Sequence, residues 1–127
     1  MDRILKVPVF NRWMKKAGLS DRILLKAIDE IKNGLIDADL GCGLLKKRVP
    51  LPGHGKRGAA RTLLAANKRG RWIFLFGFQK NERENITPHE LEALQELSSD
   101  FLKFSESSID LAVTKQELLE IFYETEK

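Results

Sequence analysis

The stretch from Arg71 to Phe78, RWIFLFGF, decides the fold, because it is the most apolar and aromatic run in the chain. Such a run, bounded by polar turns, predicts a buried central strand. The tight turn Lys68-Arg69-Gly70 pairs it as a hairpin with a preceding strand-like run from Ala60 to Asn67. A further strand is predicted from Leu44 to Val49, since two prolines then end the ladder.

Helical patterns flank these strands. Asn11 is placed to cap a short first helix that Gly18 closes, and Ser20 a second one that ends at Asn33-Gly34. Thr87-Pro88-His89-Glu90 is a capping box that begins a third helix. Residues 109–116 predict one or two more helical turns, and residues 118–123 a last strand. Helices, then strands, then helices predict an α+β fold with an antiparallel sheet.

Length and composition predict an ordinary globular protein. The chain has 127 residues, of which 43% are hydrophobic and 31% charged, so we expect a single domain over residues 1–127. The lone Cys42 excludes an internal disulfide, and no histidine–cysteine cluster points to zinc, so we expect neither metal nor cofactor. With no apolar run long enough for a membrane span, we expect a cytoplasmic protein.

Charge is unevenly distributed along the chain. Between Lys46 and Arg83 there are 11 Lys or Arg and one acid, Glu82, whereas between Glu90 and Lys127 there are 10 acids and three lysines. A basic middle of this kind favours a face that binds a polyanion, because cations that neutralise phosphates release counterions. A solvated charged surface would leave the same pattern.

The basic residues lie where neighbouring strands can bring them together. Side chains alternate along a strand, so Lys46 and Arg48 share one face and Lys47 takes the other. Arg61 opens the next strand, and Lys80 and Arg83 follow the central one. Arginine's planar fork suits phosphate oxygens, and lysine acts as a point charge.

Three further features have competing interpretations. Phe78 and Trp72 have rings that can stack on a base, but aromatics in an apolar strand usually belong to the core. Residues 53–58 match G-x-G-x-x-G, yet no acid follows at the spacing a dinucleotide site needs. This loop is therefore either a plain hairpin loop or one whose amides and Lys56 approach a phosphate. Its histidine, His54, is either a proton-transfer group or an ordinary loop residue.

Three blocks in order carry a resemblance to a known family. They are Asp39 to Val49 (DLGCGLLKKRV), Gly55 to Arg61 (GKRGAAR) and Phe76 to Ile86 (FGFQKNERENI). The chain resembles the RelE/HigB-type toxins of bacterial type II toxin–antitoxin pairs, over roughly Phe10 to Phe104. The resemblance implies a RelE-like fold, with two N-terminal helices packed on a small curved antiparallel sheet and a further C-terminal helix.

The resemblance also implies an activity, partners and site residues. It implies a ribosome-dependent mRNA interferase, an endoribonuclease held inactive by a helix-turn-helix antitoxin encoded beside it. The RNA 2′-hydroxyl would attack the adjacent phosphate without a metal. The catalytic positions it implies are Lys46, Arg48, Arg61 and Lys80. We further expect Lys47, Lys56, Arg57, Phe78 and Arg83 to contact RNA.

The sequence departs from the family pattern in two places. Asn81 stands where the best-known members have a second arginine after the lysine, and Ile86 and Thr87 stand where they have a tyrosine. The only tyrosine is Tyr123. The phosphate-binding part of the site therefore carries over better than the part that stacks a base or transfers a proton. Lys46, which is crowded by Arg48, is then the candidate for a weak general base.

Two alternatives to the nuclease remain open at this point. ParE-type relatives share the architecture but poison DNA gyrase without cleaving RNA, and a plain RNA-binding module would show only salt-sensitive binding. The acidic C-terminal extension, residues 106–127, offers a separate choice. It either covers part of the basic face or packs as a last element with an acidic, solvated side.

Overall fold

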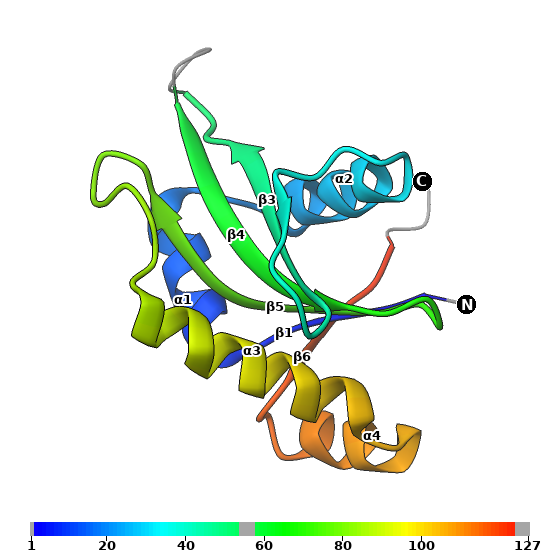
Figure 1. Cartoon of the computed structure of the whole chain (residues 1–127). Coiled ribbons are helices and arrows are strands. Elements are labelled where there is room, and N and C mark those ends of the chain that lie inside the picture. Colours follow the sequence, from blue (N-terminus) through cyan, green and yellow to red (C-terminus); the bar gives the residue numbers. More distant parts are fainter. Residues whose placement is uncertain (1, 54–57, 124–127) are drawn as a thin grey trace.

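The computed structural model describes residues 2–53 and 58–123. In chain order the elements are β1 (Arg3–Lys6), α1 (Pro8–Ala17), α2 (Asp21–Lys32), β2 (Ala38–Asp39), β3 (Leu44–Pro50), β4 (Ala59–Ala66), β5 (Arg71–Gln79), α3 (Pro88–Lys103), α4 (Glu106–Thr114) and β6 (Leu119–Ile121). Within these ranges the strands form one six-stranded sheet in the order β2-β3-β4-β5-β1-β6 (Figure 1). The α+β class predicted from the sequence is confirmed.

β5 is an interior strand, as its apolar sequence predicts. It lies between β4 and β1, and its residues from Arg71 to Leu75 are buried. The predicted hairpin with β4 forms, with Ala66 opposite Trp72 at one end and Ala60 opposite Gln79 at the other. A bulge between Leu63 and Leu64 shifts the register, and such bulges increase the local twist of a sheet.

The expected antiparallel sheet is wrong in one respect, because β1 runs parallel to β5. Arg3 lies opposite Arg71, and Lys6 lies opposite Phe74, so the sheet is mixed. No local pattern predicts β1, since only Ile4 and Leu5 are apolar in a four-residue strand. Both side chains are buried. The partner strands of β1 come from the middle and the end of the chain, which local patterns do not reveal.

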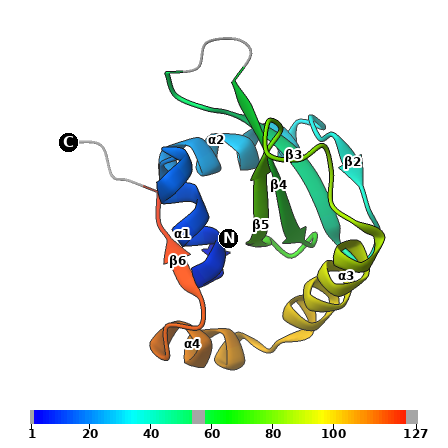
Figure 2. The same cartoon turned by 90° about the vertical axis from the view of Figure 1, so that its left-hand side faces the viewer.

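Helices lie on both sides of the sheet. Figure 2 shows α1 and α2 on one side and α3 on the other, and α1 contacts β5 while α2 contacts β3. Asn11 does not cap α1, which begins at Pro8 with Val7 in the cap position. Proline at the first helical position supplies a pre-set φ angle, so the helix begins before the polar residue. The cap of α2 is Ser20, as predicted.

Gly77 allows α1 to pack closely on β5. A Cβ atom at this position would overlap the six-membered ring of Trp13. The Trp13 ring lies near Phe10, which stacks on Phe74 at 5.2 Å between centroids. A glycine in a strand often marks such an approach, and here it fixes the separation between helix and sheet.

Two helices lie between β5 and β6, where the family resemblance implied one C-terminal helix. The Thr87 hydroxyl accepts from the Glu90 amide and the Glu90 carboxylate from the Thr87 amide, so the predicted capping box begins α3. The turn predicted at 109–116 forms α4, and the predicted final strand forms β6, antiparallel to β1. Across the described residues, we find no helix that is both long and apolar enough to cross a membrane.

Candidate functional site

Two arginines face each other on neighbouring strands. Arg48 of β3 lies directly opposite Arg61 of β4, and directly opposed residues in an antiparallel pair point to the same face. Lys46, two residues before Arg48, shares this face. Like charges placed opposite each other destabilise a sheet unless an anion compensates them. The register therefore builds a cationic cluster from two segments separated in sequence.

The guanidinium of Arg61 is largely enclosed. Its side chain is 14% exposed, and its Nε lies 3.3 Å from Oδ2 of Asp37, just before β2. Its Nη1 is buried and has no hydrogen-bond partner among the described residues. A buried donor without an acceptor costs about 1–3 kcal/mol. Arg61 is thus held from one side by a carboxylate and keeps an unused donor.

Of the other three predicted catalytic residues, Lys46 and Arg48 lie on β3 and Lys80 directly follows β5. Nζ of Lys46 donates to Oδ1 of Asn85 at 3.4 Å. Arg48 is exposed, and Lys80 is exposed two residues beyond Phe78, the cross-strand partner of Arg61. Neither Arg48 nor Lys80 has an ion pair or hydrogen bond with another residue that the structure describes. Their charges are therefore available to a ligand.

The chain as a whole matches a known protein family. A family model described as RelE toxin of RelE / RelB toxin-antitoxin system matches residues 2–121. The chain belongs to the RelE toxin family. No curated protein matches it. Since the match spans every described element, from β1 to β6, the family assignment concerns the whole fold and not one motif.

Arg83 of this RelE-family chain has partners of its own. Its Nη1 donates to Oε1 of Glu90 at 2.6 Å, and its Cζ lies 5.6 Å from the ring centroid of Phe76. The hydrogen bond from Arg83, followed by that from the Thr87 amide, lowers the pKa of Glu90 to about 2. Arg83 thus links the segment after β5 to the start of α3, which makes its primary contacts structural.

Lys47 and Phe78 are turned away from solvent. Lys47 is 6% exposed, and its Nζ donates to the carbonyl of Leu35 at 2.8 Å and pairs with Glu30 at 2.8 Å. This contact joins β3 to α2 on the face opposite Arg48. Phe78 is 3% exposed and offers no free ring surface to a base. Neither side chain is available to RNA in this conformation, so we leave both out of the proposed site.

Sequence reasoning missed Asp37 and Asn85. Asp37 lies between α2 and β2, in a polar segment with no motif, and reaches Arg61 across β3. Asn85 lies in the segment between β5 and α3 and holds Lys46. Only the tertiary pairing reveals them. Two predicted RNA contacts, Lys56 and Arg57, lie outside the described residues, as does His54.

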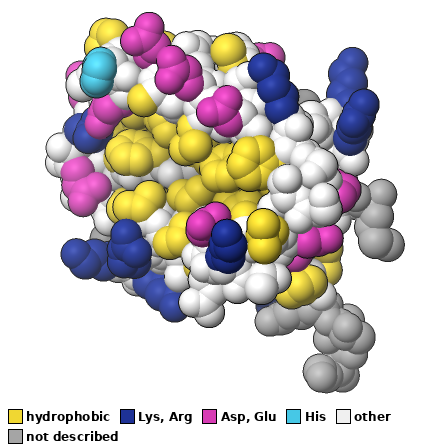
Figure 3. Space-filling view, turned by 90° about the horizontal axis from the view of Figure 1, so that it is seen from below, with side chains coloured by type: hydrophobic (Ala, Val, Ile, Leu, Met, Phe, Trp, Pro, Cys, Tyr) yellow, Lys and Arg dark blue, Asp and Glu magenta, His cyan; other side chains and the backbone are white. Residues whose placement is uncertain are grey.

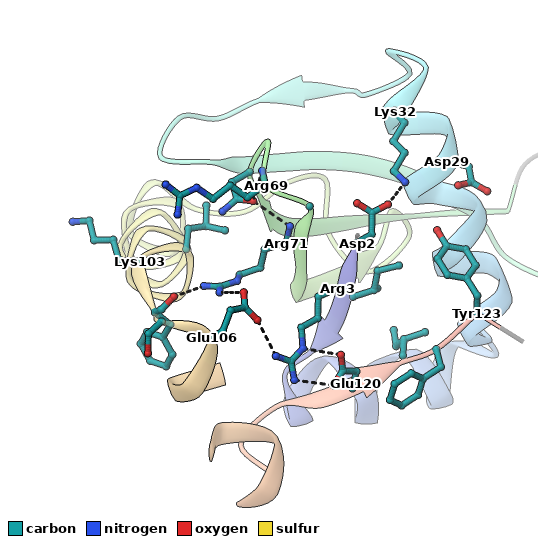
Figure 4. A pocket seen from close by; sticks show the side chains of 18 residues that line it. Asp2, Arg3, Asp29, Lys32, Arg69, Arg71, Lys103, Glu106, Glu120 and Tyr123 are labelled. Atoms are coloured by element: carbon teal, nitrogen blue, oxygen red, sulfur yellow. Dashed lines mark hydrogen bonds and ion pairs between the residues drawn. The ribbon is translucent and has the colours of Figure 1, made fainter. Parts of the chain in front are cut away.

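The acidic C-terminal segment does not cover the cationic cluster. Within residues 106–123, β6 pairs with β1, at the opposite end of the sheet order from β2 and β3. There Glu106 binds both Arg3 and Arg71, and Glu120 binds Arg3. These residues lie beside a cleft of about 1210 Å³ (Figure 4). Hydrogen bonds from Arg71 and then Arg3 lower the pKa of Glu106. The idea that this segment shields the basic face is wrong for the described residues.

Proposed function

We propose that this RelE-family toxin is an endoribonuclease that cleaves messenger RNA on the ribosome. RelE-family toxins are generally endoribonucleases. The observation that carries the proposal is the Arg48–Arg61 pair, in which one guanidinium keeps a buried donor without a partner. A phosphate that contacts Arg48 and the exposed part of Arg61 would relieve the repulsion between the two arginines.

The chemistry follows from the residues at the cluster. The RNA 2′-oxygen bonds to the adjacent phosphorus and gives up its proton, while the bond to the 5′-oxygen breaks and that oxygen takes a proton. Negative charge grows on the non-bridging oxygens. Arg61 and Lys80 stabilise this charge, and Arg48 holds the backbone. Lys46, which donates to Asn85 and shares the face of Arg48, serves as the weak base.

Such a site relies on a host particle to position its substrate. The cluster contains cations but no strong base, so much of the rate must come from orientation of the reacting atoms. The ribosome supplies that orientation in this proposal. The family's toxin–antitoxin pairing supports an antitoxin partner, which we propose is a helix-turn-helix protein that acts with the toxin in the cytoplasm.

The test compares two double variants with equal loss of charge. In Arg61→Ala/Lys80→Ala, growth arrest on induction should disappear, because losing one donor to a developing oxyanion typically costs about 10²–10³-fold in rate. The matched control is Lys68→Ala/Arg69→Ala, at the turn between β4 and β5, which should remain toxic. Equal toxicity of the two double variants would defeat the assignment.

Mapping RNA 5′ ends after induction distinguishes the competing functions. Cuts inside translated messages that depend on Arg61 support the nuclease. Intact messages with DNA damage would support a ParE-like toxin that poisons gyrase, and salt-sensitive RNA binding without growth arrest would support a plain binding module. Either of the last two results replaces the proposal.

A further inference from the structure

Exposed apolar side chains mark more than one part of the surface. Figure 3 shows one such area in the middle of the face seen from below, with charged side chains around it. Leu35 and Ile36, just before β2, differ because they lie beside a residue of the cationic cluster, Arg48. Leu35 is 58% exposed and Ile36 37%. An apolar surface beside a phosphate-binding arginine suits a nucleotide, whose base has apolar faces and whose phosphate is an anion.

Leu35 and Ile36 line a pocket of about 500 Å³ at the free edge of β3. The short β2 pairs with β3 no further than Lys46, so the rest of β3 has no neighbouring strand on that side within the described residues. Arg48 and Pro50 form the β3 wall of this pocket. Pockets of this size, with apolar walls and a few polar groups, typically hold small organic groups.

The free edge leaves the main chain of Arg48 unpaired. Peptide groups along a strand alternate between its two neighbours, and the Lys46 carbonyl accepts from the Asp37 amide on the β2 side. The amide and carbonyl of Arg48, two residues further on, therefore point to that same side, where no described residue bonds to them. One donor beside one acceptor is a pattern that the edge of a nucleobase complements.

Glu30 of α2 supplies a further acceptor to the pocket. Its Oε1 lies 2.8 Å from Nζ of Lys47, and its side chain remains 37% exposed. The second oxygen is left to accept from a ligand, and an exocyclic amino group of adenine, cytosine or guanine is a suitable donor. In uracil the one donor on the pairing edge is flanked by two carbonyl oxygens, which repel a carboxylate. The pocket therefore favours a base with an amino group.

We propose that this pocket binds the base next to the phosphate held by Arg48 and Arg61, and that it prefers adenine, cytosine or guanine over uracil. Leu35 and Ile36 cover one face of the base, and Glu30 accepts from its amino group. The inference rests on the proposed RNA cleavage and adds which bases are accepted beside the cleaved bond.

A free strand edge also suits an added strand of a protein partner. Pro50 argues against that occupant here, because proline has no N–H to donate to a ladder. On this side of β3, beyond Lys46, only Arg48 offers a main-chain donor. A base needs no more than one such donor, and its phosphate would reach the arginines.

The test measures base preference without cleavage. The purified toxin is titrated with short, uncleavable 2′-O-methyl oligonucleotides of adenine, cytosine or uracil, and fluorescence anisotropy gives the affinities. The adenine and cytosine oligonucleotides should bind about 5-fold more tightly than the uracil one. Leu35→Ser/Ile36→Ser should lower their affinity by about 5-fold to 10-fold, because the base loses an apolar surface. Leu111→Ser, at a 53% exposed position on α4, is the matched control and should bind like the unchanged protein.

Glu30→Gln provides an independent variant. Glutamine keeps the size of glutamate, but its amide donates as well as accepts. The preference for adenine and cytosine over uracil should therefore fall to nearly 1:1 in this variant, and thermal melts show whether it is folded. No binding of any oligonucleotide, equal affinity for all three, or an unchanged preference in folded Glu30→Gln overturns the proposal.

The failure of this subsite and the failure of the proposed function are distinguishable. Base preference that depends on Glu30, in a toxin that cuts no message, would refute the nuclease and keep the subsite. Message cleavage without any base preference would do the reverse. Weaker binding of the antitoxin by Leu35→Ser/Ile36→Ser, with oligonucleotide binding unchanged, would assign the free edge to a protein strand instead.

Discussion

The carboxylate of Asp37 lies 3.3 Å from Nε of Arg61 and so fixes one edge of a guanidinium whose Nη1 has no partner among the described residues. Asp37 is exposed over about a third of its side chain, at 32%. It therefore orients Arg61 without closing it off. A fixed orientation is what a phosphate-binding arginine needs, because its hydrogen bonds are directional.

We predict that Asp37→Ala separates RNA binding from cleavage. Removing a negative charge beside the cationic cluster should lower KM, whereas the loss of orientation of Arg61 should lower kcat, by about 10-fold. Steady-state cleavage in a reconstituted translation system measures both constants. Asp37→Asn is the matched control, since its amide keeps the shape and polarity of the carboxylate beside Nε and loses only the charge. It should lower KM and keep kcat. Equal kcat in Asp37→Ala and Asp37→Asn would show that Asp37 does not position Arg61.

Arg71 is predicted to be a major source of stability. It is 7% exposed, and its guanidinium donates to the carbonyls of Phe101 and Phe104 and to Glu106 at 2.6–2.9 Å. These bonds satisfy carbonyls at the C-terminal end of α3. Arg71→Met should cost about 1.5–3 kcal/mol in the free energy of unfolding, because the two carbonyls lose a charged donor while the exposed Glu106 is left to solvent.

The exposed Arg69, in the adjacent turn, provides the control for Arg71. Its side chain has no ion pair with another described residue, so Arg69→Met should change stability by less than about 0.5 kcal/mol. Urea denaturation of both variants measures the difference. Similar midpoints for Arg69→Met and Arg71→Met would contradict the stabilising role of Arg71.

Glu90 gives a pH-dependent prediction. Its pKa in the folded protein is lowered to about 2 by Arg83 and the Thr87 amide. A lowered pKa means that the folded state prefers the ionised carboxylate. The stabilisation is present above the ordinary glutamate pKa and is lost as pH falls toward 2. Glu90→Gln keeps the geometry of the capping box but removes the charge. The Tm difference between Glu90→Gln and the unchanged protein should therefore shrink between pH 5 and pH 2, and a constant difference would refute this linkage.

The sequence predicted the elements whose signals are local. The apolar run of β5, the glycine turn before it and the capping box of α3 each depend on neighbours in the chain. Strand β1 was not predicted, because four residues carry too little pattern and their partner strand begins far along the chain, at Arg71.

The same distinction holds for the candidate site. Alternation along β3 placed Lys46 and Arg48 on one face, and the hairpin order suggested that Arg61 would join them. Alternation along one strand does not predict the pairing across strands. The direct Arg48–Arg61 pairing and the carboxylate of Asp37 beside Arg61 are seen only in the structure. Alternation also put Lys47 on the opposite face. That it reaches Glu30 there, rather than solvent, depends on how α2 packs.

The close approach of α1 to β5 yields a prediction about packing. A methyl group at Gly77 would overlap the ring of Trp13, and overpacking of this kind costs about 1–3 kcal/mol. Gly77→Ala should therefore lower the Tm, and it should also distort the pocket that Trp13 and Phe76 line. In the double variant Gly77→Ala/Trp13→Leu, the smaller side chain gives the methyl group room. The loss in the double variant should consequently be smaller than the sum of the two single losses. A double-mutant cycle from thermal melts measures this coupling. Strict additivity would mean that α1 moves freely away from β5, in which case Gly77 does not set the separation between helix and sheet.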